Sequence, residues 1–292
     1  MHPNCPICQS APEYSLIRPK VVCFGFFRRK SDSRVIQRYR CTQCRKAFSR
    51  ATFHSCYRQN KRHINFRLRA LLCSGVSQRR SAQILNISRT TVVRKFLFLG
   101  KQSEMELAQM NSDRSPVREM EFDDLETFEH SKCKPISVPL SVESKSRYIL
   151  GFEVASMPAK GKLVAKAIRK YGPRHDGRAL ARSALFKKIS PVLAPGALIR
   201  SDQNPHYPTS VRKYFPKSPH ETHKGRRGCI VGQGELKKIG FDPLFSLNHT
   251  CAKFRADINR LFRRTWCTTK KIERLKIHIA IYSVFHNQRL PV

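Results

Sequence analysis

Six carboxylates lie within residues 119–129, a segment that contains no lysine or arginine. The whole chain has 20 Asp and Glu against 57 Lys and Arg, which gives a formal net charge of +37. Mg²⁺ prefers oxygen ligands and is usually bound through only one or two carboxylates. The segment therefore predicts a divalent-cation site in a protein that binds a polyanion, with a solvated acidic edge as the alternative.

The strands that would position these acids can be placed from the apolar pattern. The phenylalanine and leucine residues of the acidic segment indicate a short strand at 120–125 with one buried face. Two more strands are expected at 136–142 and 148–154, followed by a helix at 177–189. A short apolar run at 197–202 reads as a buried strand that ends in an acid, Asp202.

A long amphipathic helix is expected over residues 242–266, with Asp242 as its cap and Pro243 at its first position. Asn248 and Arg255 lie two turns apart on one flank, so a helix packed on the sheet can direct both toward one site. A flank that faces solvent is the alternative. The buried stripe beside this flank would consist of Leu247, Cys251, Phe254, Ile258 and Leu261.

Two Cys-x-x-Cys pairs, separated by thirty-two residues, occur near the N-terminus. Each pair is typical of a tight turn whose two sulfurs converge on one ion, and four thiolates match a tetrahedral zinc site. Such a site is structural, because no position is left open for a substrate. Four ordinary buried cysteines are the alternative. The predicted ligands are Cys5, Cys8, Cys41 and Cys44.

Residues 62–110 show a helical pattern with two serine caps. Ser77 can cap a second helix and Ser88 a third one, which can extend to Met110. A helix, a tight turn and a capped helix with polar first residues indicate a helix-turn-helix, whose second helix enters the major groove. A plain helical hairpin is the alternative. The residues expected to face DNA are Arg89, Thr90, Thr91 and Arg94.

Composition limits the classes of protein that fit. There is no apolar run long enough to span a membrane and no apolar region of a signal peptide, so the cysteines are expected in a reducing compartment. A pI near 10.5 points to phosphate backbones as the partner. A ribosomal protein would share this charge, but it would not need the acidic segment.

Several of these segments together resemble a small bacterial insertion-sequence transposase of the DDE type, which has an RNase H-like core. The resemblance covers nearly the whole chain. It predicts a multidomain α+β protein with a zinc ribbon at 1–58, a helix-turn-helix at 62–110 and a catalytic α/β domain at 119–292. Its motifs, besides the cysteine pairs and the helix-turn-helix, are Phe122-Asp123-Asp124, 200–204 (Arg-Ser-Asp-Gln-Asn), 247–250 (Leu-Asn-His-Thr), 263–271 (Arg-Arg-Thr-Trp-Cys-Thr-Thr-Lys-Lys) and 285–287 (Phe-His-Asn).

The resemblance implies a metal-dependent nuclease and strand transferase that acts on the ends of its own element. Asp123 matches the first catalytic acid and Asp202 the second, and Mg²⁺ or Mn²⁺ would be the catalytic cofactor. In-line phosphoryl transfer with two such ions fits this ligand set. Asn248 would complete the metal site, and Arg255 would contact the scissile phosphate or support the ligands.

The third acidic position departs from the family pattern. A glutamate would stand about seven residues before a helical arginine, but Asn248 stands there, as in some relatives. Asparagine offers one carbonyl oxygen to a cation, but it is neither an anionic ligand nor a base. The fallback acids are Asp257, on the opposite side of the helix, and Glu235, in a loop. A transposase-derived DNA-binding regulator without cleavage activity is therefore the competing hypothesis.

The resemblance also implies partners and a location. Double-stranded DNA, both element ends and target, would be bound, and the active form would be a homodimer or a larger assembly on DNA. The expected location is the bacterial cytoplasm, at the nucleoid. The basic residues of the block after the long helix would add DNA contacts, namely Arg263, Arg264, Lys270 and Lys271.

Overall fold

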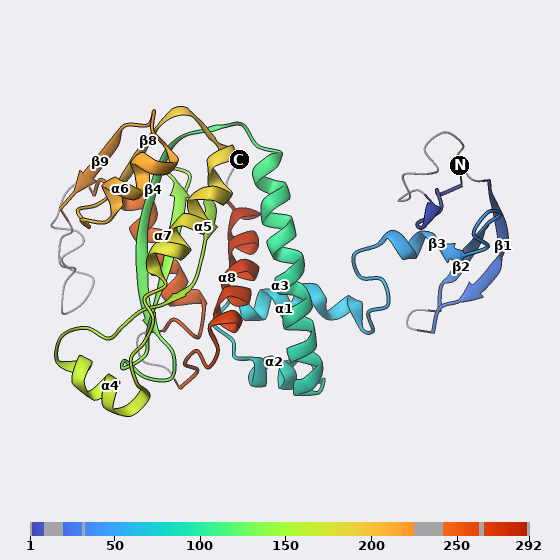
Figure 1. Cartoon of the computed structure of the whole chain (residues 1–292). Coiled ribbons are helices and arrows are strands. Elements are labelled where there is room, and N and C mark those ends of the chain that lie inside the picture. Colours follow the sequence, from blue (N-terminus) through green and yellow to red (C-terminus); the bar gives the residue numbers. More distant parts are fainter. Residues whose placement is uncertain (1, 9–19, 31–32, 225–241, 263–265, 291–292) are drawn as a thin grey trace. The chain divides into compact units, whose positions relative to one another are not determined.

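A computed structural model describes the chain except residues 1, 9–19, 31–32, 225–241, 263–265 and 291–292. The chain divides into two compact units, Met1–Asn65 and Phe66–Val292 (Figure 1). The described part is a mixture of helices and strands, as the α+β prediction required. No helix in it is both long enough and apolar enough to cross a membrane.

The first unit is built on a three-stranded antiparallel sheet in the order β1-β2-β3. Its strands are β1 (Val21–Arg28), β2 (Val35–Cys41) and β3 (Ala47–Ser49). The buried cluster beneath the sheet is small, and three of its members are cysteines. It consists of Cys5, Cys8, Tyr39, Cys41 and Phe48.

The second unit contains a six-stranded mixed sheet in the order β6-β5-β4-β8-β9, with β7 paired to β5. The pairs β4–β5 and β5–β6 are antiparallel, whereas β4–β8 and β8–β9 are parallel. Strands appear at all four ranges that the apolar pattern predicted. The strands are β4 (Val117–Phe128), β5 (Pro135–Glu143), β6 (Ile149–Phe152), β7 (Ala155–Ser156), β8 (Leu193–Asp202) and β9 (His220–His223).

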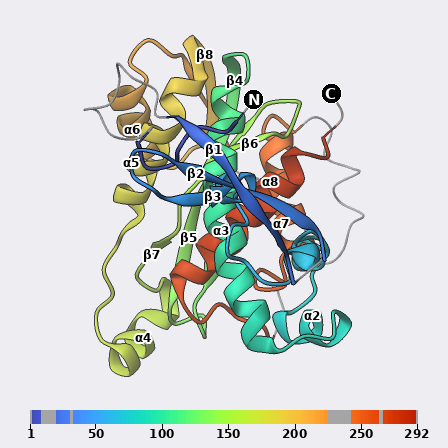
Figure 2. The ribbon, with the colours of Figure 1, turned by 90° about the vertical axis from the view of Figure 1, so that its right-hand side faces the viewer.

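Helices cover both faces of this sheet. Figure 2 shows α5 and α6 on one side of the sheet, and α7 and α8 on the other. Each face has its own hydrophobic cluster, one shared with α5 and α6 and one shared with α1, α2, α3, α7 and α8. The helices are α1 (Asn65–Leu72), α2 (Gln78–Ile84), α3 (Arg89–Ser112), α4 (Val164–Tyr171), α5 (Arg178–Ile189), α6 (Tyr207–Tyr214), α7 (Phe245–Asp257) and α8 (Ile272–Asn287).

The helices predicted as a helix-turn-helix share their core with the sheet. The α3 helix lies along α8, and a Cβ added at Gly100 would lie only 2.3 Å from the Ile277 side chain. The ring of Phe96 on α3 also packs edge-to-face on His278 of α8. Residues 66–110 therefore belong to the same compact unit as the six-stranded sheet.

Serine caps start α2 and α3 where they were predicted. The Ser77 hydroxyl accepts a hydrogen bond from the Arg80 N–H at 3.2 Å, and the Ser88 hydroxyl accepts one from the Thr91 N–H at 3.1 Å. The α3 helix continues to Ser112, two residues beyond the predicted end.

The helix predicted at 242–266 is shorter than expected. It begins at Phe245, because Asp242 and Pro243 form a turn in which the Asp242 carboxylate accepts from the Leu244 N–H. It ends at Asp257, whose carbonyl accepts from the Gly75 N–H at 2.6 Å, and the next residue is extended. A tertiary hydrogen bond thus occupies the carbonyl at which the predicted helix would have continued.

Candidate active site and cysteine cluster

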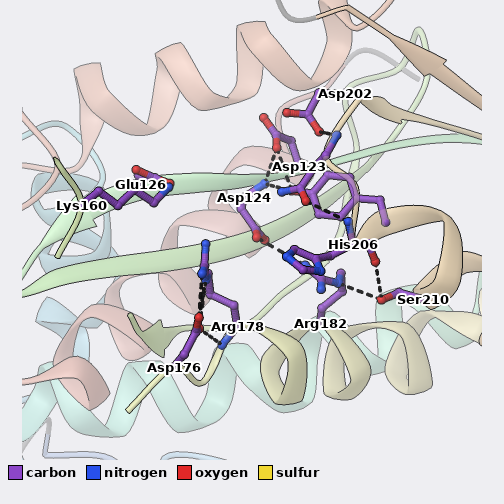
Figure 3. Close-up of polar contacts among 12 residues, drawn as sticks. Asp123, Asp124, Glu126, Lys160, Asp176, Arg178, Arg182, Asp202, His206 and Ser210 are labelled. Atoms are coloured by element: carbon purple, nitrogen blue, oxygen red, sulfur yellow. Dashed lines mark hydrogen bonds and ion pairs between the residues drawn. The ribbon is translucent and has the colours of Figure 1, made fainter. Parts of the chain in front are cut away.

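The two predicted catalytic acids lie on adjacent parallel strands. The β4–β8 ladder pairs Phe122 with Ser201, so Asp123 and Asp202 follow side by side. Figure 3 shows their carboxylates on the same side of the site. Adjacent strands of a sheet lie about 4.8 Å apart, so this pairing places the two carboxylates close together.

Asp123 and Asp124 point to opposite faces of β4. The sequence alone does not show which helices cover each of these faces. Successive side chains of β4 point to opposite faces of the sheet. Asp124 faces α5, where its carboxylate lies 3.6 Å from the Arg182 guanidinium and both side chains are largely buried. Burial raises the pKa of Asp124 to about 6, and the positive charge of Arg182 opposes this shift. Asp124 therefore belongs to a structural ion pair.

Asp123 has a different set of neighbours. Its Oδ1 accepts hydrogen bonds from the Tyr207 hydroxyl at 3.0 Å and from the backbone N–H of Asp124 at 2.7 Å. Burial raises the pKa of Asp123, and the nearby charge of Asp202 raises it further. Among the described residues, neither Asp123 nor Asp202 forms an ion pair with a basic side chain.

The remaining acids of the 119–129 segment have structural partners. Three of them form ion pairs with basic side chains of neighbouring elements: Glu119 with Arg200, Glu126 with Lys160, and Glu129 with Arg174 and Lys134. Glu119, Glu126 and Glu129 therefore belong to ion pairs, whereas Asp123 does not.

Glu121 lies on the same face as Asp123 and holds α7 in place. It is 3% exposed, and its carboxylate accepts a hydrogen bond from the Leu247 N–H at 2.8 Å. Leu247 is in the first turn of α7, where backbone N–H groups lack helical partners and a carboxylate is favoured. Burial raises the pKa of Glu121, whereas the Leu247 N–H lowers it. This contact sets the position of α7 against the strand that carries Asp123.

Through this contact, α7, which carries Asn248 and Arg255 on one flank, packs against β4, the strand of Asp123. Cys251 lies on the same flank, and burial raises its pKa to about 12, with Arg255 lowering the pKa and Asp123 raising it. The thiol is thus within electrostatic range of both charges. The Asn248 side chain is exposed, and its Nδ2 donates to Asp242 Oδ2 at 2.9 Å. The structure gives no direct hydrogen bond between Asn248 and Asp123.

The described structure does not support either alternative to Asn248 as the third metal ligand. Asp257 accepts a hydrogen bond from the Tyr282 hydroxyl at 2.6 Å and pairs with Lys253 at 2.8 Å. Tyr282 belongs to α8, so the Asp257 side chain is directed away from the Asp123 flank, as helical spacing predicted. Glu235 lies outside the described residues.

The four N-terminal cysteines form a cluster in which all sulfurs lie within 4.8 Å of one another. The Cys5 and Cys44 sulfurs are 3.5 Å apart, and those of Cys8 and Cys41 are 3.9 Å apart. Burial raises the pKa of Cys5, and that of Cys8 to about 12, whereas the backbone N–H groups of Cys44 and Gln43 outweigh burial at Cys41 and lower its pKa to about 7. Amides directed at sulfur favour thiolates, so the donor set fits a soft or borderline metal ion.

The residues predicted to face DNA lie at the start of α3. Arg89, Thr90 and Arg94 are exposed, whereas Thr91 is partly buried and its hydroxyl lies 2.9 Å from that of Ser88. This end of the helix therefore presents two arginines and a threonine to solvent.

The basic block after α7 is described only in part. Lys270 and Lys271 are exposed, just before α8 begins. The neighbouring Thr269 forms a parallel bridge with Glu129, which ties this segment to the end of β4. Arg263 and Arg264 lie outside the described residues.

The His-Asn pair near the C-terminus has a structural role. The Asn287 side chain accepts from the Ile149 N–H at 2.9 Å and donates to the Ile149 carbonyl at 3.0 Å. His286 Nε2 lies 3.0 Å from the carbonyl of Arg147. The Asn287 contacts let α8 satisfy backbone groups of β6, the edge strand of the sheet.

Sequence reasoning missed Tyr207, Glu121 and Arg182. Tyr207 follows Asp202 by five residues and is completely buried, and the Arg182 guanidinium lies 5.0 Å from the centre of its ring. Glu121 could have been found from its spacing, because it lies two residues before Asp123 and so shares its face. Nothing in the sequence links Tyr207 or Arg182 to the acids, since those contacts depend on how α5 and α6 pack.

Searches of protein-family models and of curated proteins found no match to this chain.

Proposed function

We propose that this chain is a DDE-type transposase that cleaves DNA strands and joins them at the ends of its insertion element. The observation that carries the proposal is the pair Asp123 and Asp202. These carboxylates lie side by side without a basic partner among the described residues, in a chain that has 57 Lys and Arg. Two adjacent acids that repel each other are explained if a divalent cation lies between them.

The architecture of the second unit supports an RNase H-like assignment. A mixed sheet with three antiparallel strands and two parallel neighbours carries the acids on β4 and β8, and helices cover both faces. The α7 helix, which Glu121 holds against β4, brings a third set of polar groups toward the same region.

The donor set fits Mg²⁺ or Mn²⁺. Asp123 and Asp202 offer anionic oxygens, and Asn248 offers a carbonyl oxygen, as hard cations prefer. Such ions, when bound, supply activation of water or a 3′-hydroxyl and neutralise the charge that develops during in-line phosphoryl transfer.

The chain's own groups prepare this site. The Tyr207 hydroxyl fixes the orientation of Asp123 by donating to Oδ1, so that Oδ2 stays available. Arg255, on the Asn248 flank, would attract the scissile phosphate. The exposed residues Arg89, Thr90 and Arg94 at the start of α3 would contact the element ends in the major groove.

We further propose that Cys5, Cys8, Cys41 and Cys44 bind one structural Zn²⁺. Four sulfurs within 4.8 Å of one another are a complete tetrahedral ligand set. The first unit would then be a zinc ribbon that adds phosphate contacts through its many basic side chains.

A nicking assay tests the proposed activity. Its substrate is the DNA that flanks the coding sequence, with Mg²⁺ or Mn²⁺ present. Asp123→Ala and Asp202→Ala should each abolish cleavage but leave DNA binding largely intact, because each removes an anionic ligand and no phosphate contact. Glu126→Ala is the matched control, since Glu126 lies on the same strand in a half-exposed ion pair with Lys160. Equal damage from Glu126→Ala would argue against the assigned pair.

The second candidate is a transposase-derived DNA-binding regulator. It is favoured by Asn248, which carries no charge and donates its amide to Asp242. This function keeps DNA binding and requires no cleavage. A wild-type chain that binds the flanking DNA tightly but never nicks it with either metal would decide for the regulator.

A further inference from the structure

Strand β1 of the first unit leaves three phenylalanines in solvent. Phe24, Phe26 and Phe27 are 37%, 68% and 42% exposed, although the buried cluster of this unit is small. Isolated apolar side chains on a surface need no explanation, but three within four residues of one strand do.

The strand register divides these rings between the two faces of the sheet. Phe26 pairs with Gln37 on the face of the buried Tyr39, whereas Phe27 pairs with Ile36 on the opposite face. A bulge between Cys23 and Phe26 interrupts the alternation. Gly25 allows the bulge through its positive φ of 68°, and its carbonyl accepts from Gln37 Nε2 at 3.0 Å.

The bulge places Phe24 beside two arginines of β2. The guanidinium carbons of Arg38 and Arg40 lie 5.0 Å and 4.7 Å from the centre of the Phe24 ring. Even-numbered residues of β2 point away from the buried Tyr39 and Cys41, so these arginines share the outer face with Phe27. The outer face, defined here as Phe24, Phe27, Arg38 and Arg40, thus combines aromatic rings with planar cations.

We propose that this outer face binds single-stranded DNA by stacking bases on its rings and guanidinium groups. Arginine and phenylalanine side by side form a stacking platform, and the cations attract the phosphates. The first unit has 14 Lys and Arg against 2 Asp and Glu, a net formal charge of +12, which complements a polyanion. This inference rests on the proposed function in one respect, namely that the polyanion is DNA.

A single strand fits this face better than a duplex does. Base faces are hidden inside duplex DNA, so the exposed rings would find no partner there. A strand that unpairs beside a nick at an element end has the free base faces that such a platform needs. The α3 helix would hold the duplex while the outer face holds the single strand.

The test compares variants of the full-length, zinc-loaded chain in fluorescence anisotropy with a labelled oligothymidine and with a labelled duplex. Phe24→Ala and Phe27→Ala together should weaken binding of the single strand by roughly tenfold or more, because each stacked base contributes measurably to affinity. Duplex binding should stay within about twofold. Phe26→Ala, on the same strand but the opposite face, is the matched control and should bind like the wild type.

Three outcomes would overturn the proposal. The outer-face variant could bind the single strand like the wild type, Phe26→Ala could be equally damaging, or polyglutamate could displace the strand as efficiently as unlabelled oligothymidine does. Zinc content reports whether each variant is folded, and Phe27→Tyr, which keeps a ring, should retain binding even if the alanine variant misfolds. Duplex binding separates this inference from the proposed function, because a chain that binds the duplex normally but not the single strand refutes only the inference.

Discussion

At the scale of single residues, the contacts of each carboxylate in residues 119–129 indicate the role of that carboxylate. Glu119, Glu126 and Glu129 pair with cations, Asp124 pairs with Arg182, and Glu121 binds the first turn of α7. Asp123 differs, since its neighbours are a tyrosine hydroxyl and a second carboxylate. An acid kept beside another acid is the feature that marks a functional site rather than a stabilising pair.

Removing the Tyr207 hydroxyl should impair catalysis more than folding. We expect Tyr207→Phe to lower cleavage about tenfold, because loss of one hydrogen bond lets the Asp123 carboxylate rotate. The ring and its packing on Phe122 remain, so the melting temperature should change little. Because Tyr207 acts through Asp123, the concentration of Mg²⁺ that gives half-maximal cleavage should also rise.

Tyr214→Phe is the control for this experiment, since Tyr214 lies on the same helix and packs on Phe186. A Tyr207→Phe variant with unchanged cleavage and unchanged metal dependence would show that the hydroxyl does not position Asp123.

Substitutions at Asn248 test whether this residue is the third metal ligand. Asn248→Ala should lower cleavage by at least about tenfold if its carbonyl oxygen is a metal ligand. Asn248→Asp restores the missing charge, but it also places a carboxylate where the amide now donates to Asp242 at 2.9 Å. Without metal, the two acids would repel each other and raise their pKa values.

The exchange variant Asn248→Asp with Asp242→Asn removes this repulsion and should be more active than Asn248→Asp alone. Cleavage rates of the three variants at fixed Mg²⁺ make the comparison. If Asn248→Ala cleaves like the wild type, the third ligand lies elsewhere.

At the scale of elements, β4 organises the second unit. It is central in the sheet, and its alternating side chains separate the Asp123 face from the face packed on α5 and α6. Specific polar contacts attach the helices to this frame, since Glu121 fixes the start of α7 and Asn287 fixes α8 to the edge strand. The long α3 helix depends instead on close packing, because Gly100 lets it approach Ile277.

A methyl group at this contact should destabilise the second unit. In Gly100→Ala, the new Cβ would lie 2.3 Å from Ile277 Cγ2, so the helices must separate. Overpacking of this kind costs about 1–3 kcal/mol, which exceeds the helix-propensity gain of alanine. Urea denaturation followed by circular dichroism measures the effect.

Ile277→Ala provides the matched partner for this substitution. Because it opens space at the same point, the double variant should be more stable than the sum of the two single effects predicts. Strictly additive effects, or a Gly100→Ala protein as stable as the wild type, would contradict close contact between α3 and α8.

At the scale of the whole molecule, the two units have different sources of stability. The second unit has two large hydrophobic clusters, one on each face of its sheet. Among its described residues, the first unit buries only five in its cluster, and three of them belong to the cysteine set. So small a core rarely supports a fold without a metal or a disulfide.

Chelation of zinc should therefore unfold the first unit selectively. A strong chelator, or Cys8→Ser, should remove the dispersed amide NMR signals of β1 and β2 while leaving those of the second unit. Cys23→Ser is the control, because Cys23 is exposed and outside the cluster. A metal-free chain whose first unit keeps its dispersed signals would refute a structural zinc site.

The sequence by itself determined the local features. Spacing placed the cysteine pairs, the serine caps of α2 and α3, and four strands of the second unit, because turns, caps and alternation depend on neighbouring residues. The apolar run at 197–202 also predicted Asp202 at the end of a buried strand, whereas the choice of Asp123 came from the family resemblance. The transposase assignment itself rests on the resemblance and stays a prediction.

Only the tertiary structure decided what depends on residues far apart in the chain. The choice between Asp123 and Asp124 required knowing which helix covers each face of β4, and the end of α7 at Asp257 depended on a hydrogen bond from Gly75. The α1–α3 helices share the core of the sheet because α3 contacts α8, which is more than 150 residues away in the chain. Such packing is set by the sum of many weak contacts, which no local pattern records.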